Sequence, residues 1–297
     1  YGDVFEPFFA IIYAFLIFRI FRSRNPILRS QFYLFTIATG VCAISNVLFN
    51  FAMRIIDVRT RLLPERGVLC TILSWLSHIF ALSLTIGKIL TVTTRFTAIC
   101  MPDREKKFWT CRKTLLLLVG MFLIPFVLFA FFPFQSPVFG RTDDGYGRFL
   151  GIEGVAYKIA KAIGTAGYAL FFVTTIPMCL MAILRLRKDR MVRRERNNEN
   201  TLLLESISPG GRSIPKYEIT LLIYALVLTA THIIWFIALF SDAIELQHSI
   251  INHYLIPNAL SSFAEPILLV ITSSQVRSEL FSCRRKQART PSIAMTA

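Results

Sequence analysis

Seven long runs of apolar residues constrain the fold of this chain more than any other feature. A helix needs about 20 mostly apolar residues to cross a bilayer, whose hydrocarbon core is about 30 Å thick. Only 17% of the 297 residues are charged and 54% are hydrophobic, whereas soluble domains are about 25% charged. We therefore predict an all-α membrane protein, a single domain over 1–297 with helices at about 4–21, 32–53, 69–93, 115–134, 159–184, 219–240 and 254–272.

The distribution of Lys and Arg predicts which way the seven-helix bundle faces. With the N-terminus outside, the predicted cytoplasmic segments carry 24 of the 33 Lys and Arg residues and the outer segments carry 8, while Lys88 lies inside a predicted helix. Lys and Arg collect on the cytoplasmic side of membrane proteins. We therefore predict an outer N-terminus, a cytoplasmic C-terminus and a cytoplasmic tail at 275–297. No basic segment with a cleavage site precedes the first apolar run, so we expect that run to act as its own insertion signal.

The net charge of +15 follows from this topology, so we expect membrane lipids and no nucleic acid as partners. Much of the charge lies in a predicted basic third cytoplasmic loop at 185–216. Two interpretations fit this loop. Either it is solvated and its charges lie against lipid headgroups, or its helical ends receive a cytosolic partner.

The placement of the cysteines argues against a disulfide and a metal site. The loop at 135–158 contains no Cys, so it cannot form the disulfide to helix three that is common in rhodopsin-like receptors. No spacing of Cys and His resembles a zinc site, and we expect no metal and no cofactor. Cys283 follows a short amphipathic stretch, Val276 to Phe281, which we predict to be a helix 8 with Cys283 as a palmitoylation site.

Two segments carry a resemblance to a known group of receptors. The first reads Thr94-Arg95-Phe96-Thr97-Ala98-Ile99-Cys100-Met101-Pro102, with Trp109 downstream, and the second runs from Glu265-Pro266 to Val276-Arg277. In these segments the chain resembles the nematode serpentine chemoreceptors of the gamma superfamily, in class V or class gamma. The resemblance implies a chemosensory receptor that responds to an unknown small ligand, couples to a heterotrimeric G protein and lies in the plasma membrane of sensory neurons, including their cilia.

Arg95, Phe96 and Pro102 are the residues to which the resemblance gives a coupling role. An arginine at the cytoplasmic mouth of the third helix could contact a helix of a G protein once helix six moves outward. The alternative is that Arg95 anchors to lipid phosphate, as any arginine at the interface can. Thr94 stands where rhodopsin-like receptors have an acid, so no adjacent carboxylate holds Arg95.

Lys88 and Glu265 are ionisable residues inside predicted membrane helices, where a charge costs about 2.5–3.5 kcal/mol on insertion scales and usually faces a partner. Lys88 precedes Arg95 by seven residues, so both share one face, about 10 Å apart along the helix. Our hypothesis is a buried ion pair between Lys88 and Glu265 that holds the inactive state, with Asn46 nearby. The alternative is that Lys88 extends toward the headgroups and Glu265 bonds to helix two or to its own kinked backbone.

A ligand pocket is expected between the outer halves of helices three, five, six and seven, because sites in helix bundles form between facing helices. The alternative for each candidate is core packing or a place in the aromatic belt at the membrane interface. For His78 it is also a hydrogen bond between helices. The candidates are Trp75, His78, Tyr168, His232, Trp235 and Asn258.

Other classes of function find less support in the sequence. It contains no phosphate-binding loop, nucleophile elbow or pair of catalytic carboxylates, so we expect no enzyme. A seven-helix transporter or channel-like protein is the alternative, although the internal repeats and multiple intramembrane charges typical of transporters are missing. A scaffolding protein without a ligand is the third reading. Activation of a G protein by a ligand would separate the receptor from both.

Overall fold

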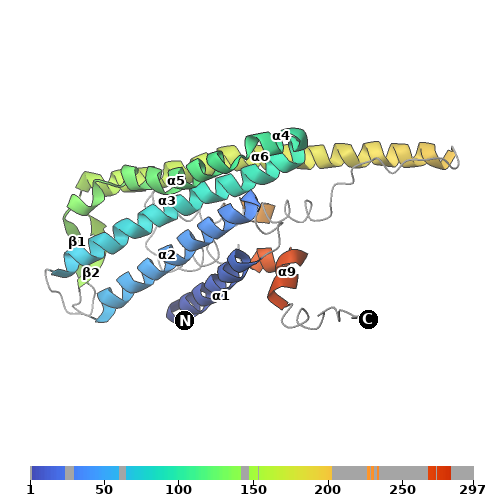
Figure 1. Cartoon of the computed structure of the whole chain (residues 1–297). Helices are drawn as coiled ribbons and strands as arrows, with labels where there is room; N and C mark the ends of the chain where they lie inside the picture. The colour runs from blue at the N-terminus through green and yellow to red at the C-terminus, as the bar shows by residue number, and fades with distance from the viewer. Residues whose placement is uncertain are drawn as a thin grey trace, which may run out of the picture.

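The computed structural model describes residues 2–23, 30–59, 65–141, 147–152, 154–202, 226–227, 229–230, 233, 267–271 and 273–281. These residues form a bundle of long helices (Figure 1). Four of the described helical segments are long and apolar enough to cross a membrane: Gln31–Met53, Val68–Cys100, Cys111–Phe134 and Gly154–Lys188.

The long helices are α1 (Gly2–Arg22), α2 (Gln31–Arg59), α3 (Glu65–Cys100), α5 (Cys111–Leu128) and α6 (Gly154–Leu202). Three short elements join or follow them, namely α4 (Pro102–Phe108), the 3₁₀ turn η2 (Phe132–Phe134) and α9 (Ser274–Phe281). Between α5 and α6 the chain forms an antiparallel hairpin of β1 (Pro137–Arg141) and β2 (Gly147–Ile152). The predicted loop at 135–158 therefore contains a hairpin that the apolar runs gave no sign of.

The bundle has two ends, which we name after residues of α3, its central helix. Phe32 at the start of α2 lies against Arg95, and the first turn of α5 follows α4 at this Arg95 end. Trp75 bonds to Phe129 near the end of α5, which defines the opposite, Trp75 end. Figure 1 shows the β1–β2 hairpin at the Trp75 end and α9 at the Arg95 end.

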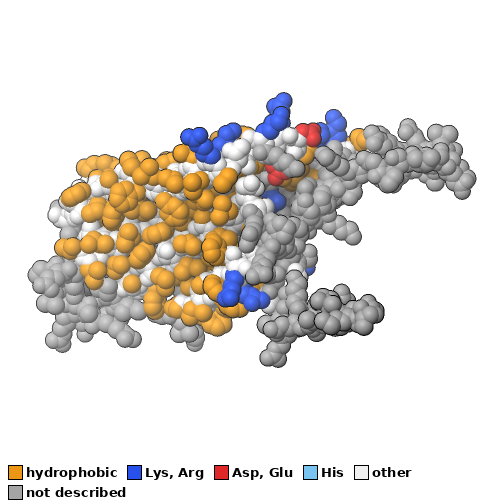
Figure 2. Space-filling view, viewed as in Figure 1, with side chains coloured by type: hydrophobic (Ala, Val, Ile, Leu, Met, Phe, Trp, Pro, Cys, Tyr) orange, Lys and Arg blue, Asp and Glu red, His pale blue; other side chains and the backbone are white. Residues whose placement is uncertain are grey.

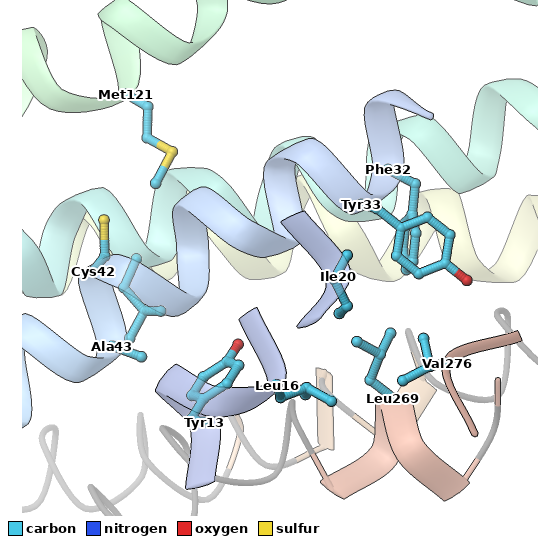
Figure 3. Close-up of a cluster of buried hydrophobic side chains, with 11 residues drawn as sticks. Tyr13, Leu16, Ile20, Phe32, Tyr33, Cys42, Ala43, Met121, Leu269 and Val276 are labelled. Atoms are coloured by element: carbon cyan, nitrogen blue, oxygen red, sulfur yellow. The ribbon is translucent and has the colours of Figure 1, made fainter. Parts of the chain in front are cut away.

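The largest cluster of buried side chains joins α1, α2 and α3 to the segment 267–271 and α9. Figure 3 shows Tyr13, Leu16 and Ile20 of α1 near the side chains of α2, with Leu269 and Val276 to the right of Leu16. All five are at most 4% exposed. The packing therefore ties the first helix to the described end of the last predicted span and to α9.

The outer faces of the helices are apolar over much of their length. On α5, Leu116 and Val127 are 71% and 62% exposed, and the buried residues of this helix are Thr114, Met121 and Pro125. Figure 2 shows a broad hydrophobic surface, with the coloured Lys and Arg side chains gathered toward the Arg95 end. An apolar surface of this extent would be unusual on a soluble monomer, and it suits contact with lipid.

The helices extend beyond the predicted spans. The predicted range 159–184 lies inside α6, which continues to Leu202, so the first part of the basic segment 185–216 is helical. Figure 1 shows this part of α6 projecting past the rest of the bundle. Of the predicted spans 219–240 and 254–272, the structure describes residues 226–227, 229–230, 233 and 267–271, which are helical, and the rest lies outside the described residues.

Candidate functional site

Arg95 lies buried at its end of the bundle against an aromatic ring. The guanidinium carbon of Arg95 is 3.5 Å from the centroid of the Phe32 ring, and the two residues are 9% and 2% exposed. A cation over an aromatic face gains about 2 kcal/mol or more when the pair is desolvated. Thr94, which occupies the position of the missing acid, uses its hydroxyl to donate to the carbonyl of Thr91 at 2.7 Å. The Phe32 ring is thus one contact of the buried Arg95 guanidinium.

The residue next to Phe32 connects α2 to the start of α9. The Tyr33 hydroxyl and the Ser273 hydroxyl are hydrogen-bonded at 3.0 Å, and both residues are buried. The Tyr33 ring meets the Phe32 ring edge to face, with centroids 5.0 Å apart and planes at 81°. Figure 3 shows this aromatic pair at the first turn of α2. The Arg95 contact and the Ser273 contact therefore share one aromatic pair.

Trp109, between α4 and α5, joins the same region from the other side. Its indole N–H donates to the Thr97 hydroxyl at 2.7 Å. Its ring packs edge to face against the Phe35 ring, with the ring centroids 5.6 Å apart. The Gln31 side-chain amide donates to the Trp109 carbonyl at 3.3 Å. Trp109 is 4% exposed, so it fixes the α4 connection onto α2 and α3. In the sequence, Trp109 serves only as part of the family resemblance, and this packing role was not predicted from it.

The other two predicted coupling residues also lie at the Arg95 end. Pro102 is exposed at the first position of α4, where its fixed backbone angle suits a helix start. Phe96 is half-buried on α3. Phe32, whose ring lies over Arg95, was not among the residues predicted from the sequence.

Lys88 lies in the interior of the bundle, two turns before Arg95 on α3, and is 0% exposed. Its proposed partner Glu265 lies outside the described residues, so the ion pair remains a hypothesis. Asn46, expected near this pair, accepts a hydrogen bond from the Ser77 hydroxyl at 2.8 Å. Ser77 precedes Lys88 by eleven residues, about 16 Å along the helix. The structure therefore places Asn46 closer to the Trp75 end than expected.

Trp75 and His78, two of the predicted pocket residues, meet the aromatic end of α5. The Trp75 indole N–H donates to the Phe129 carbonyl at 2.8 Å. The same carbonyl also accepts a hydrogen bond from the backbone N–H of Phe132 at 3.0 Å. The His78 ring packs against those of Phe129 and Phe132, and its Nδ1–H donates to the Ser74 carbonyl at 2.7 Å.

Tyr168 lies deeper in the bundle than these two residues. It is 9% exposed on α6, and the neighbouring Gly167 packs against Leu82, one turn past His78 on α3. The predicted pocket residues His232, Trp235 and Asn258 lie outside the described residues, as does Cys283. The structure thus places three of the six pocket residues, two of which share one aromatic cluster.

A buried polar cluster between α2 and α3 was not among the predicted site residues. The Asn46 side-chain oxygen accepts from Ser77 and, at 3.1 Å, from the side-chain amide of Asn50. Asn46 and Ser77 are 4% and 8% exposed. Asparagines within an apolar run are the sequence signal that could have drawn attention to it.

The described part of the chain holds no group of three His, Cys, Asp or Glu side chains that could bind a metal ion. Its cysteines, Cys42, Cys70, Cys100, Cys111 and Cys179, are not in disulfides.

The chain matches a known protein family over most of its length. A family described as serpentine type 7TM GPCR chemoreceptor Srv matches residues 5–285, nearly all of the 297. No curated protein sequence matches the chain. The matched range includes both segments that carry the resemblance, and it confirms that resemblance in its class V form. It also includes the predicted spans that lie largely outside the described residues.

Proposed function

We propose, because the chain belongs to the Srv family of serpentine seven-transmembrane chemoreceptors, that it binds a small diffusible ligand inside the bundle and activates a heterotrimeric G protein. The membrane would be the plasma membrane of a sensory neuron, including its cilium. The observation that carries the coupling part is the position of Arg95, held at the end of α3 among residues of α2.

The orientation that this function needs puts the Arg95 end in the cytoplasm. Basic residues of several described elements occur at this end: Arg19, Arg22, Arg104, Lys107, Arg112, Lys113, Arg185, Arg187, Lys188 and Arg277. They flank apolar segments on the side where the sequence places 24 of the 33 Lys and Arg residues. This excess of Lys and Arg at the Arg95 end supports a cytoplasmic Arg95 end and an outer N-terminus.

The burial of Arg95 favours the coupling role over lipid anchoring. Arg95 is 9% exposed and its guanidinium lies over the Phe32 ring, which places it inside the rim of the bundle, where a headgroup phosphate would not be its natural partner. Movement of the predicted span 219–240 away from α3 would open the space beside it. A helix of the G protein could then reach Arg95, with Phe96 and Pro102 close by.

The ligand would bind toward the Trp75 end, between α3, α6 and the predicted spans 219–240 and 254–272. Trp75 and His78 supply an aromatic wall with α5, and Asn46 with Ser77 supplies hydrogen-bonding groups nearby. Apolar pockets with a few placed polar groups are typical of small-molecule sites. Tyr168, His232, Trp235 and Asn258 complete the proposed lining.

The buried Lys88 supports the proposal of an inactive-state ion pair with Glu265. A lysine that is 0% exposed inside a membrane protein needs a stabilising partner. The charge-swapped variant Lys88→Glu/Glu265→Lys should recover the surface expression and signalling that each single variant loses. If the double variant does no better than the single variants, the pair does not exist.

Guanine-nucleotide exchange on purified Gα subunits tests the coupling role. Membranes containing the protein would be screened with small-molecule extracts, comparing the wild type with Arg95→Ala and with Arg112→Ala, an exposed arginine at the same end. We expect extract-dependent exchange that is lost in Arg95→Ala and retained in Arg112→Ala. Exchange that survives in Arg95→Ala, or its absence with every Gα although the protein is folded at the cell surface, would contradict the proposal.

A further inference from the structure

We infer that Phe32 and Tyr33 are positioning residues that hold Arg95 in the inactive receptor and link its release to the docking of α9. This inference rests on the proposed coupling role of Arg95 and concerns how that role is regulated. We call the contact of Arg95 with this aromatic pair the arginine seat.

The first step is that the Phe32 ring lies close enough to the guanidinium to attract it. The separation of 3.5 Å between guanidinium carbon and ring centroid is well inside the range of about 6 Å over which such pairs attract. Both partners are buried, so water screens the attraction little. Thr94, the neighbour of Arg95 on the chain, bonds to its own helix.

The second step is that the seat is tied to α9 through Tyr33. The Ser273 hydroxyl that bonds to Tyr33 also accepts from the backbone N–H of Val276 at 3.2 Å. Ser273 therefore caps the start of α9 while it holds α2. In addition, the Arg277 guanidinium donates to the carbonyls of Val270 and Ile271, which fixes α9 onto the end of the helical segment 267–271.

The third step is that the two contacts should break together. A displacement of 267–273 would separate Ser273 from Tyr33, and a buried hydroxyl without a partner is unfavourable. Tyr33 would then reorient, and the Phe32 ring that it supports edge to face would lose its support. Arg95 would become available to the G protein as the end of the last helix moves.

Basal exchange without ligand tests the seat. We expect Phe32→Leu to raise basal exchange about tenfold, since it removes a desolvated cation–π contact, and Tyr33→Phe to raise it about fivefold by removing one hydrogen bond. Phe32→Tyr keeps the ring and should stay near wild type. The matched control is Phe18→Leu. It removes a similar contact, with the Arg22 guanidinium carbon 6.0 Å from the Phe18 ring centroid, but on an exposed surface. We expect Phe18→Leu to leave basal exchange unchanged.

Hydrogen–deuterium exchange at 274–281, measured in nanodiscs without G protein, tests the link from the arginine seat to α9 separately from the coupling role of Arg95. We expect Tyr33→Phe to speed amide exchange in α9 about fivefold, while Phe18→Leu has no effect. If Tyr33→Phe leaves the amide exchange of α9 unchanged, the link from the seat to α9 is overturned, even if the receptor activates a Gα subunit. If Phe32→Leu shows wild-type basal exchange while the wild type responds to extracts, the seat is overturned and the coupling role stands. A wild type that activates no Gα contradicts the coupling role, and the exchange at α9 still decides the link.

Discussion

Gly87 on α3 lies against Thr39 of α2 and Met121 of α5, next to the buried Lys88. A Cβ atom at this position would come within 2.6 Å of the Thr39 hydroxyl oxygen and 2.9 Å of the Met121 methyl carbon. Thr39 is held by a hydrogen bond to the Phe35 carbonyl at 2.6 Å, and both Thr39 and Met121 are 0% exposed. Gly87→Ala must therefore push α2 away from α3 or break the Thr39 bond.

The expected cost follows from two opposing terms. Overpacking a buried site costs about 1–3 kcal/mol. Because Thr39 is held by its hydrogen bond and cannot easily move, we expect the cost of Gly87→Ala to lie toward the upper end of this range. Replacing a Gly inside a helix with Ala stabilises the helix by about 1 kcal/mol, because Ala has the higher helix propensity. We therefore expect Gly87→Ala to lower the free energy of unfolding by about 1–2 kcal/mol. Gly164 on α6 is the matched control, because its Cβ would meet nothing within 4 Å, and Gly164→Ala should stabilise.

Thermal unfolding of the two variants in one detergent measures the difference. We expect the Tm of Gly87→Ala to fall by about 2–4 °C and that of Gly164→Ala to stay level or rise. A Gly87→Ala Tm at or above that of the wild type would show that α2 and α3 are not packed as described.

Two further predictions concern indole hydrogen bonds that the structure shows. Trp109→Phe should lower the free energy of unfolding by about 1 kcal/mol, and a double-mutant cycle with Thr97→Val should give a coupling energy of similar size; additive effects would show that the bond between them is absent. Trp75→Phe removes the donor to the Phe129 carbonyl but keeps an aromatic ring, so Tm should fall while surface expression persists; an unchanged Tm would contradict this bond.

The sequence predicted the membrane-spanning character of α2, α3, α5 and α6 because a bilayer requires long apolar segments. It could not predict which face of each helix is buried, since lipid and protein core are both apolar. On α5 the buried Thr114, Met121 and Pro125 stand among equally apolar neighbours. The periodic pattern that marks a core face in soluble proteins is therefore weak here.

The residues of the candidate site were predictable to different degrees. Arg95 and Pro102 could be found because the resemblance lies in one continuous segment. The contact of Arg95 with Phe32 joins residues far apart in sequence, and only the packing of α2 on α3 brings them together. The same holds for the bond of Tyr33 to Ser273, which joins the two ends of the chain.

The central claim is that the Arg95 end receives a G protein in the cytoplasm. Photocrosslinking in intact cells tests it directly, with a photoreactive residue placed either at Met101, which is 43% exposed beside Arg95's helix end, or at Val155, which is 71% exposed on the first turn of α6 at the Trp75 end. We expect the photoreactive residue at Met101 to trap a Gα subunit and the one at Val155 to trap none. A Gα subunit trapped at Val155 and not at Met101 would contradict both the orientation and the coupling site.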